Sequence, residues 1–305
     1  MERIKEAYLR IPSVILTATP ANINSDYGPI KIYKKGDLCA GYEDILNYLY
    51  EIYNTGLTRI MGGRGVFEKT LNKVFLESLC KNEQINKWIE YGKNDQNRTE
   101  RALMRHTLNH LLNALDDNMY DNQNNRLTEN NEEDIIKNFP EEMYLYPISE
   151  EIIKTGSIIT HKNGEEKYVI MTPACDLAKR KSGDFKTDNI LLVEIDKKEM
   201  VINSALVEIV KKHKKGNKLN SIFGNNHTDY YHWLANTDFF EGGFLNFRKL
   251  LTINKDDFEQ LYRPLKIQIS QAFVKDIVAR FSSYYARQGQ PDIDSSVIIK
   301  SFIEN

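Results

Sequence analysis

Lys167-Tyr-Val-Ile-Met-Thr-Pro-Ala-Cys-Asp-Leu177 is the stretch of sequence that decides the fold of the second half of the chain. Its β-branched and aromatic run, stopped by Pro173, predicts a buried strand that ends in a loop. A thiol, Cys175, and a carboxylate, Asp176, follow the proline directly. Because loops on rigid strands often carry functional side chains, we take these two residues as a candidate site.

Further strand signals flank this run. Gly156-Ser-Ile-Ile-Thr-His161 precedes it, Ile190-Leu-Leu-Val-Glu-Ile195 follows it, and Asn163-Gly164 between the first two strands is a strong hairpin signal. An amphipathic helix over residues 269–285 closes the region. Residues 139–305 are therefore predicted to form a β-rich domain with a C-terminal helix.

The preceding residues, 41–138, have helical periodicity. Apolar residues recur at helical spacing from Tyr42, from Phe67 and from Leu103, and Gly56 is a natural end for the first helix. Residues 116–133 are rich in Asp, Asn and Glu, which is typical of a mobile polar linker. We expect a helical domain over 41–138 that ends in this linker.

Residues 1–40 contain two short β-rich runs, Ser13-Val-Ile-Leu-Thr17 followed by Ala18, and Ile30-Lys-Ile-Tyr33 followed by Lys34-Lys35. This order resembles the last third of a two-component receiver domain, in which the Thr and the Lys end neighbouring strands. A generic βαβ edge is the alternative. No acidic pair or phosphoacceptor Asp precedes the runs, so the resemblance implies a truncated receiver-like segment that is not itself phosphorylated.

Two further resemblances concern residues 139–305. The order of strand, hairpin, strand and late Leu-Leu-Val strand resembles the SH3-like β-barrel of plasmid-toxin endoribonucleases. Thr172-Pro-Ala-Cys-Asp-Leu177 together with Arg280-Phe-Ser-Ser-Tyr-Tyr-Ala-Arg-Gln-Gly-Gln-Pro291 resembles a group of prokaryotic proteins of unknown activity, some of which occur beside phage-defence or signalling components. These resemblances imply an α+β fold: a receiver-like remnant, a helical middle and a C-terminal barrel with capping helices.

Composition excludes several classes of protein. Lys plus Arg (41) nearly equals Asp plus Glu (43), which argues against a globally basic nucleic-acid binder and leaves only a local basic patch. The three cysteines are too scattered for a disulfide framework or a paired-cysteine zinc site. No apolar run approaches the roughly 18 residues of a membrane helix. We expect a cytoplasmic protein without membrane association or cofactor.

Cys175 has two interpretations. A thiolate nucleophile needs a base or a positive field, which His161 on the preceding strand and the cations Lys179, Arg180 and Lys181 could supply. The adjacent Asp176 disfavours the thiolate. In the structural alternative, Asp176 caps the loop and Cys175 packs as a small hydrophobic residue.

Other basic residues and two histidines are candidates for binding nucleic acid, phosphate or a metal ion. Lys179-Arg-Lys181 and Lys211-Lys-His-Lys-Lys215 could contact a nucleic-acid backbone, or lie on an ordinary solvated surface. Arg64 in Met61-Gly-Gly-Arg-Gly65 could bind phosphate, or belong to a tight turn between helices. His106 and His110 have metal-ligand spacing but lack an acidic residue between them, so interior histidines are favoured and no metal is expected.

Arg280 and Arg287 lie on the charged face of the C-terminal helix. Ion pairs within the helix would account for them. Alternatively, a bidentate bond from Arg280 to Asp176 would tie the two motifs together across the barrel. We favour this structural coupling over a catalytic role for the two motifs.

The sequence therefore favours a non-catalytic regulatory or interaction component of a prokaryotic signalling or phage-defence system, with a protein as its partner. The alternative is an enzyme, either an endoribonuclease-like barrel that acts on nucleic acid or a hydrolase that depends on Cys175. Nucleic acid and a second copy of the chain stay open as further partners.

Overall fold

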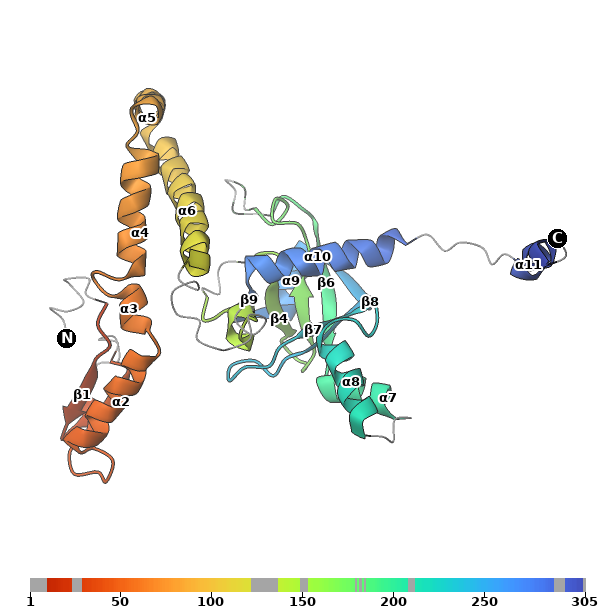
Figure 1. Cartoon of the computed structure of the whole chain (residues 1–305), viewed down its shortest axis with the longest axis horizontal. Coiled ribbons are helices and arrows are strands. Elements are labelled where there is room, and N and C mark those ends of the chain that lie inside the picture. The colour runs from red at the N-terminus through yellow and green to blue at the C-terminus, as the bar shows by residue number, and fades with distance from the viewer. Residues whose placement is uncertain are drawn as a thin grey trace. The chain divides into compact units, whose positions relative to one another are not determined.

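The chain forms two compact units, residues 1–130 (unit 1) and residues 131–305 (unit 2), which are described separately (Figure 1). The division lies inside the predicted linker of residues 116–133. Residues 116–121 of that segment are helical, which corrects the prediction, and the rest of it lies outside the described residues. The computed structural model describes residues 10–23, 29–121, 137–148, 153–178, 180, 183, 185–207, 212–287 and 294–303.

Unit 1 begins with a parallel pair of strands, β1 (Val14–Thr17) and β2 (Lys31–Lys34). Thr17 lies opposite Lys34, and the backbone N–H of Lys35 donates to the Thr17 carbonyl at 2.8 Å. Parallel strands need a crossover connection, here residues 18–30, which include the short helix η1 (Pro20–Asn22). Parallel pairing is common to a receiver domain and to any βαβ edge, so the receiver resemblance stays a prediction.

Helices make up the rest of unit 1. Gly41 precedes the first of them, and its N–H donates to the Asp44 side chain at 3.2 Å, which satisfies one of the free donors at the helix start. α6 packs against both α4 and α5. Among the described residues no helix, not even the 26-residue α6, is both long and apolar enough to cross a membrane. The elements are α2 (Tyr42–Asn54), α3 (Leu57–Met61), α4 (Val66–Val74) with its π-helical continuation η3 (Phe75–Leu79), α5 (Asn82–Asn94) and α6 (Gln96–Asp121).

Unit 1 buries very little apolar surface. In its described part only three apolar side chains are buried, those of Tyr33, Ile45 and Val74. All three clusters of buried hydrophobic residues in the described chain lie in unit 2. Because apolar burial is the main term that offsets the conformational entropy lost on folding, unit 1 has an unusually small core for its size.

Unit 2 is built on a seven-stranded antiparallel sheet with the order β3-β9-β4-β5-β6-β8-β7. The predicted hairpin at Asn163-Gly164 is confirmed, since it joins β4 to β5. A closed barrel is not shown: within the described residues the end strands β3 and β7 do not pair. The sheet curls, however, and the Tyr144 hydroxyl on β3 donates to the carbonyl of Ala235, directly after β7, at 2.6 Å. The strands are β3 (Tyr144–Leu145), β4 (Ser157–His161), β5 (Lys167–Ile170), β6 (Asn189–Asp196), β7 (Tyr231–Leu234), β8 (Gly243–Asn254) and β9 (Tyr262–Ile269).

Both faces of the central strands are covered, which explains their continuous apolar sequence. Ile158 packs in the cluster that includes Ile277 of α10, whereas its neighbour Ile159 packs in the cluster that includes Phe258 of α9. Gly156, with φ of +88°, allows α10 to approach closely, because a Cβ there would lie 2.4 Å from a methyl group of Val274. The helices of unit 2 are η6 (Pro140–Met143), α7 (Lys198–Leu206), α8 (Lys212–Phe223), α9 (Lys255–Leu261), α10 (Gln271–Ala286) and α11 (Ser295–Ile303).

Candidate functional site

Hydrogen bonds fix the Thr172–Leu177 loop that follows β5. The Thr172 hydroxyl accepts a hydrogen bond from the N–H of Leu191 at 2.7 Å. The Asp176 carbonyl accepts from the N–H groups of Lys186 and Thr187 at 3.0 and 3.2 Å. These bonds attach the loop to β6 and to the segment that leads into it. The motif therefore has a structural role: it ties the end of β5 to its neighbour β6 in the interior of the sheet.

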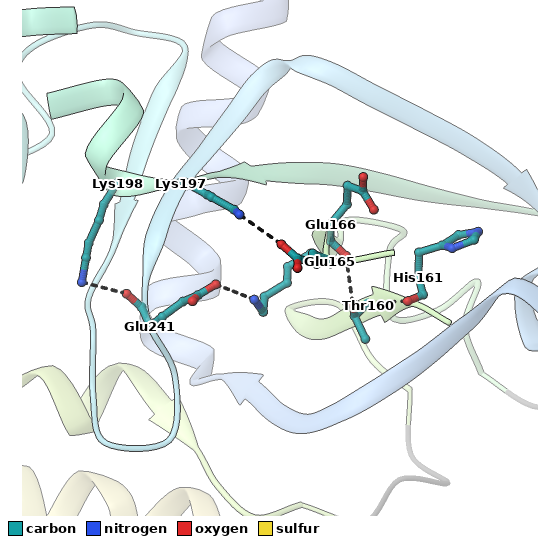
Figure 2. Close-up of polar contacts among 8 residues, drawn as sticks. Thr160, His161, Glu165, Glu166, Lys197, Lys198 and Glu241 are labelled. Atoms are coloured by element: carbon teal, nitrogen blue, oxygen red, sulfur yellow. Dashed lines mark hydrogen bonds and ion pairs between the residues drawn. The ribbon is translucent and has the colours of Figure 1, made fainter. Parts of the chain in front are cut away.

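The candidate nucleophile Cys175 lies exposed on this loop, so the prediction that it packs as a small hydrophobic residue is wrong. Its Sγ contacts the Asp176 carboxylate at 3.6 Å, and that carboxylate lies 3.9 Å from the ammonium of Lys186. His161, at the end of β4 (Figure 2), makes other contacts. Its Nδ1 accepts from the N–H of Asn163 at 3.2 Å. Within the described residues, no hydrogen bond brings a base to the thiol, so the contacts of the loop do not assemble a nucleophile.

Replacing Cys175 with Ser is expected to change the free energy of unfolding by less than about 0.5 kcal/mol, because the thiol is exposed and anchors nothing. Urea unfolding of the full chain measures this. Leu177→Ala is the matched control in the same loop: Leu177 is 4% exposed, and its truncation should cost about 2–4 kcal/mol. A Cys175→Ser variant that folds but loses its biological activity would contradict the structural role.

Arg180 and Arg64, two of the predicted basic residues, are described within their own units. Arg180 donates to the Lys186 carbonyl at 3.3 Å, while Lys179 and Lys181 lie outside the described residues. Arg64 lines an open cavity of about 730 Å³ between α3 and α4. At Gly65 a Cβ would lie 2.5 Å from the Ile60 carbonyl oxygen, so the glycine is needed for a tight turn between these helices.

His106 and His110 lie together on α6, with their Nε2 atoms 3.2 Å apart. The ring of Trp88 on α5 packs on His106, with ring centroids 5.6 Å apart. Across the described residues no group of three or more His, Cys, Asp or Glu side chains is arranged to hold a metal ion. The pair of histidines thus contributes to the packing between α5 and α6.

Arg280 does not bind Asp176, which corrects the predicted link between the two motifs. Its Nη2 donates to the backbone carbonyls of Asn225 and Tyr231, at 2.9 and 3.2 Å. The Asp176 carboxylate instead faces Lys186. Helical spacing showed that Arg280 lies on the charged side of α10, but it could not show which strand that side would meet.

The three aromatic members of the Arg280-Phe-Ser-Ser-Tyr-Tyr285 motif contact one short segment of β8. The ring of Phe281 packs against Phe247 with centroids 5.5 Å apart. The Tyr284 hydroxyl accepts from Nε of Arg248 at 3.1 Å, and the Tyr285 hydroxyl donates to the Phe247 carbonyl at 2.6 Å. Packing and hydrogen bonds from the motif therefore hold this segment of β8 against α10.

That segment is a bulge. Along β6 and β8, Val193 pairs with Leu250 but Ile195 pairs with Leu245, so residues 246–249 have only Glu194 opposite them. A bulge bends a strand and turns its side chains in new directions. Here Phe247 is fully buried while Arg248, beside it, is exposed. We call residues 246–249 the β8 bulge.

Arginine and tyrosine side chains form a continuous array beside the β8 bulge. The guanidinium carbon of Arg248 lies 3.7 Å from the ring centroid of Tyr230, and that of Arg287 lies 4.7 Å from the ring centroid of Tyr284. Arg287 also binds the Asp229 carboxylate at 2.5 Å. A cavity of about 440 Å³ lies at this array, lined by Asp229, Ala279, Arg280, Ser283, Tyr284 and Arg287.

A buried carboxylate supports the other side of the β8 bulge. The side chain of Asp196 is 2% exposed and accepts from Nζ of Lys249 at 2.6 Å, from Nδ2 of Asn246 at 2.8 Å and from the hydroxyl of Tyr231 at 3.0 Å. Lys249 also binds Glu194 at 2.6 Å. These two hydrogen bonds, first that to Asp196, raise the pKa of Lys249. Burial, together with Asp196, raises the pKa of Tyr231 to about 12.

Lysine–glutamate pairs line a second cavity, of about 320 Å³, next to Asp196 (Figure 2). Lys197 binds Glu165 at 3.2 Å, Lys167 binds Glu241, and Lys198 donates to the Glu241 carbonyl at 3.3 Å. Because each of these cations already has an acidic or carbonyl partner, the cavity offers no free cation to a ligand. Its polar groups hold the β4–β5 turn and the β6–α7 connection in place.

Sequence patterns did not find Arg248, Lys249 or Asp196. Arg248 and Lys249 lie in the β8 bulge, which leaves no periodic signal, whereas Tyr284 was part of a recognised motif. The structure brings Arg280 and Arg287 together with this group, away from Cys175, Asp176 and His161 in its contacts. No protein-family model, no curated protein and no solved structure matches the chain.

Proposed function

We propose that this chain is a non-catalytic interaction component that binds a partner protein through the helices of unit 1. The observation that carries this proposal is the small core of unit 1, which has only three buried apolar side chains among its described residues. Many other apolar side chains of unit 1 are exposed. Contiguous exposed apolar surface in a protein marks a site of interaction with another molecule. The sequence motifs that resemble defence- and signalling-associated proteins support a place in such a system.

The exposed apolar side chains form stripes at helical spacing. On α6, Met104, Leu108 and Leu112 are 60%, 57% and 61% exposed and lie four residues apart, so they share one face. A second stripe on α2 comprises Tyr42, Leu46, Tyr50 and Tyr53. Stripes of this kind are recognised by a helix of a partner that lies along them with its own apolar face.

Charge favours an acidic partner for the α6 stripe. Arg98, Arg101 and Arg105 lie in the same half of α6, and none of them has an ion pair within the described residues. A second copy of the chain docked in parallel would place these arginines against one another. We therefore assign the stripe to an amphipathic helix of a different protein, with acidic residues beside its apolar face.

Leu108→Glu is expected to weaken binding of this partner at least about 100-fold, because it places a charge in the centre of the apolar contact. Asn109→Glu is the matched control: it is exposed, adds the same charge and lies outside the stripe. The partner is identified with a photo-crosslinking amino acid at Met104 of the full chain in cells that encode it. Its affinity for the variants is then measured with both proteins purified.

Three outcomes would contradict the proposal. The crosslink could fall on unit 2 of the same molecule, which would make the stripe an internal contact. Light scattering could show a dimer of the wild-type chain that Leu108→Glu dissociates, which would make a second copy the occupant. Finally, the partner could bind Leu108→Glu and Asn109→Glu equally well. A single crosslinked protein with an acidic amphipathic helix at the crosslink would support it.

A further inference from the structure

We propose that the arginine–tyrosine array of unit 2 (Tyr230, Arg248, Tyr284 and Arg287) binds single-stranded nucleic acid, with bases stacked on its rings and guanidinium planes. This site goes beyond the proposed function, which rests on unit 1. The array combines the two groups that single strands need: planar surfaces for bases and cations for phosphates.

The array is held in place before any ligand arrives. Nε of Arg248 donates to the Tyr284 hydroxyl at 3.1 Å, and its guanidinium lies over Tyr230. Tyr284 belongs to α10, whose Ile277 is fully buried in the core of unit 2. A guanidinium fixed in this way loses less conformational freedom on binding than a free side chain, which favours affinity.

The charge of the site is positive and only partly compensated. Within the described residues Arg248 has no carboxylate partner. Arg280 donates to two backbone carbonyls, and its Nε is buried without a hydrogen-bond partner. Only Arg287 faces a carboxylate, that of Asp229, at 2.5 Å. Asp276 lies one turn before Arg280 on α10, so three arginines face two aspartates, which leaves a net positive charge for a phosphate backbone.

The shape of the site suits an extended strand. Arg280, Tyr284 and Arg287 follow one another at i, i+4 and i+7 along α10, and the small side chains of Ala279 and Ser283 lie beside them. The cavity of about 440 Å³ at this ridge is lined by these small residues as well as by Arg280, Tyr284 and Arg287.

The test measures binding of fluorescein-labelled 12-nucleotide oligo-dT and oligo-U to the full chain by fluorescence anisotropy at 50 mM salt. Arg248→Ala is expected to weaken binding about tenfold, and Arg248→Lys, which keeps the charge but loses the plane, to weaken it several-fold. Lys275→Ala is the control, since it removes the same charge from an exposed position on α10 away from the ridge. It should change binding less than twofold.

Three results would overturn the proposal. First, the wild-type chain could fail to bind either oligonucleotide at 50 mM salt. Lys275→Ala could weaken binding as much as Arg248→Ala, which would indicate diffuse attraction. A duplex, a mononucleotide or a poly-glutamate peptide could bind as tightly as the 12-mers and depend equally on Arg248, which would assign the site to that ligand. Circular dichroism confirms that each variant is folded.

Discussion

Acidification from pH 7 to pH 4.5 is expected to lower the free energy of unfolding by about 2–3 kcal/mol through His232 alone. This histidine lies on β7, is 2% exposed, and its Nδ1 has no hydrogen-bond partner among the described residues. Burial, and next the nearby charge of Arg280, lower its pKa to about 3. Its neutral form is therefore the one that fits the fold.

The sign of the effect follows from this depressed pKa. The unfolded chain takes up a proton at His232 below about pH 6.5, whereas the folded chain does so only near pH 3. Stability is thus complete above pH 6.5 and is lost as the pH falls towards 3, by about 1.4 kcal/mol per pH unit. Asp276, with its Oδ2 3.8 Å from Nδ1, would favour the protonated form, but its side chain is 62% exposed and screened by water.

Trp233 is a suitable probe for this prediction, because it is next to His232 and Trp88 is the only other tryptophan of the chain. In a Trp88→Phe background, urea unfolding followed by fluorescence at several pH values reports on unit 2. His232→Gln should flatten the dependence of the unfolding free energy on pH. His227→Gln should retain most of this dependence, although the pKa of His227 is also lowered by burial and by Lys218. An unchanged slope in His232→Gln would contradict the assignment.

The parts of the fold that follow from sequence are those with a regular period. The helices from Tyr42, Phe67 and Leu103 and the hairpin at Asn163-Gly164 were predicted, because each repeats apolar residues at helical spacing or has a specific turn signal. β8 was not, since its buried residues 243–247 are consecutive and its exposed ones follow as a second run. A bulge separates these two runs and removes the alternation of a strand.

For the candidate site, too, the sequence predicted a local pattern but not its tertiary contacts. The Arg280-Phe-Ser-Ser-Tyr-Tyr285 motif was recognised from sequence, but its partner was expected to be Asp176 and is instead the β8 bulge with the start of β7. Spacing on a helix defines which side chains share a face, and it carries no information about the segment that this face contacts. Arg248 became a site residue only because a bulge turned it towards Tyr284.

Removing the carboxylate of Asp196 is expected to cost about 2–4 kcal/mol of unfolding free energy. In Asp196→Ala, Asn246 and Tyr231 lose the acceptor of their side-chain hydrogen bonds, at 2.8 and 3.0 Å, inside the protein. Lys249 loses one of its two acidic partners, but its side chain is 42% exposed and can be solvated by water. The cost therefore comes mainly from the two neutral donors, the buried Asn246 and the half-buried Tyr231, which lose their acceptor.

Glu194→Ala is the matched control for this prediction, since it removes the other carboxylate that binds Lys249. The Glu194 side chain is 28% exposed, so we expect a loss of no more than about 1 kcal/mol. Urea unfolding compares the two variants, and equal losses would show that the network does not depend on the buried acid. Ultraviolet titration gives an independent check: without Asp196, the pKa of Tyr231 should fall below its value of about 12 but stay above 10, because burial is the larger cause of its shift.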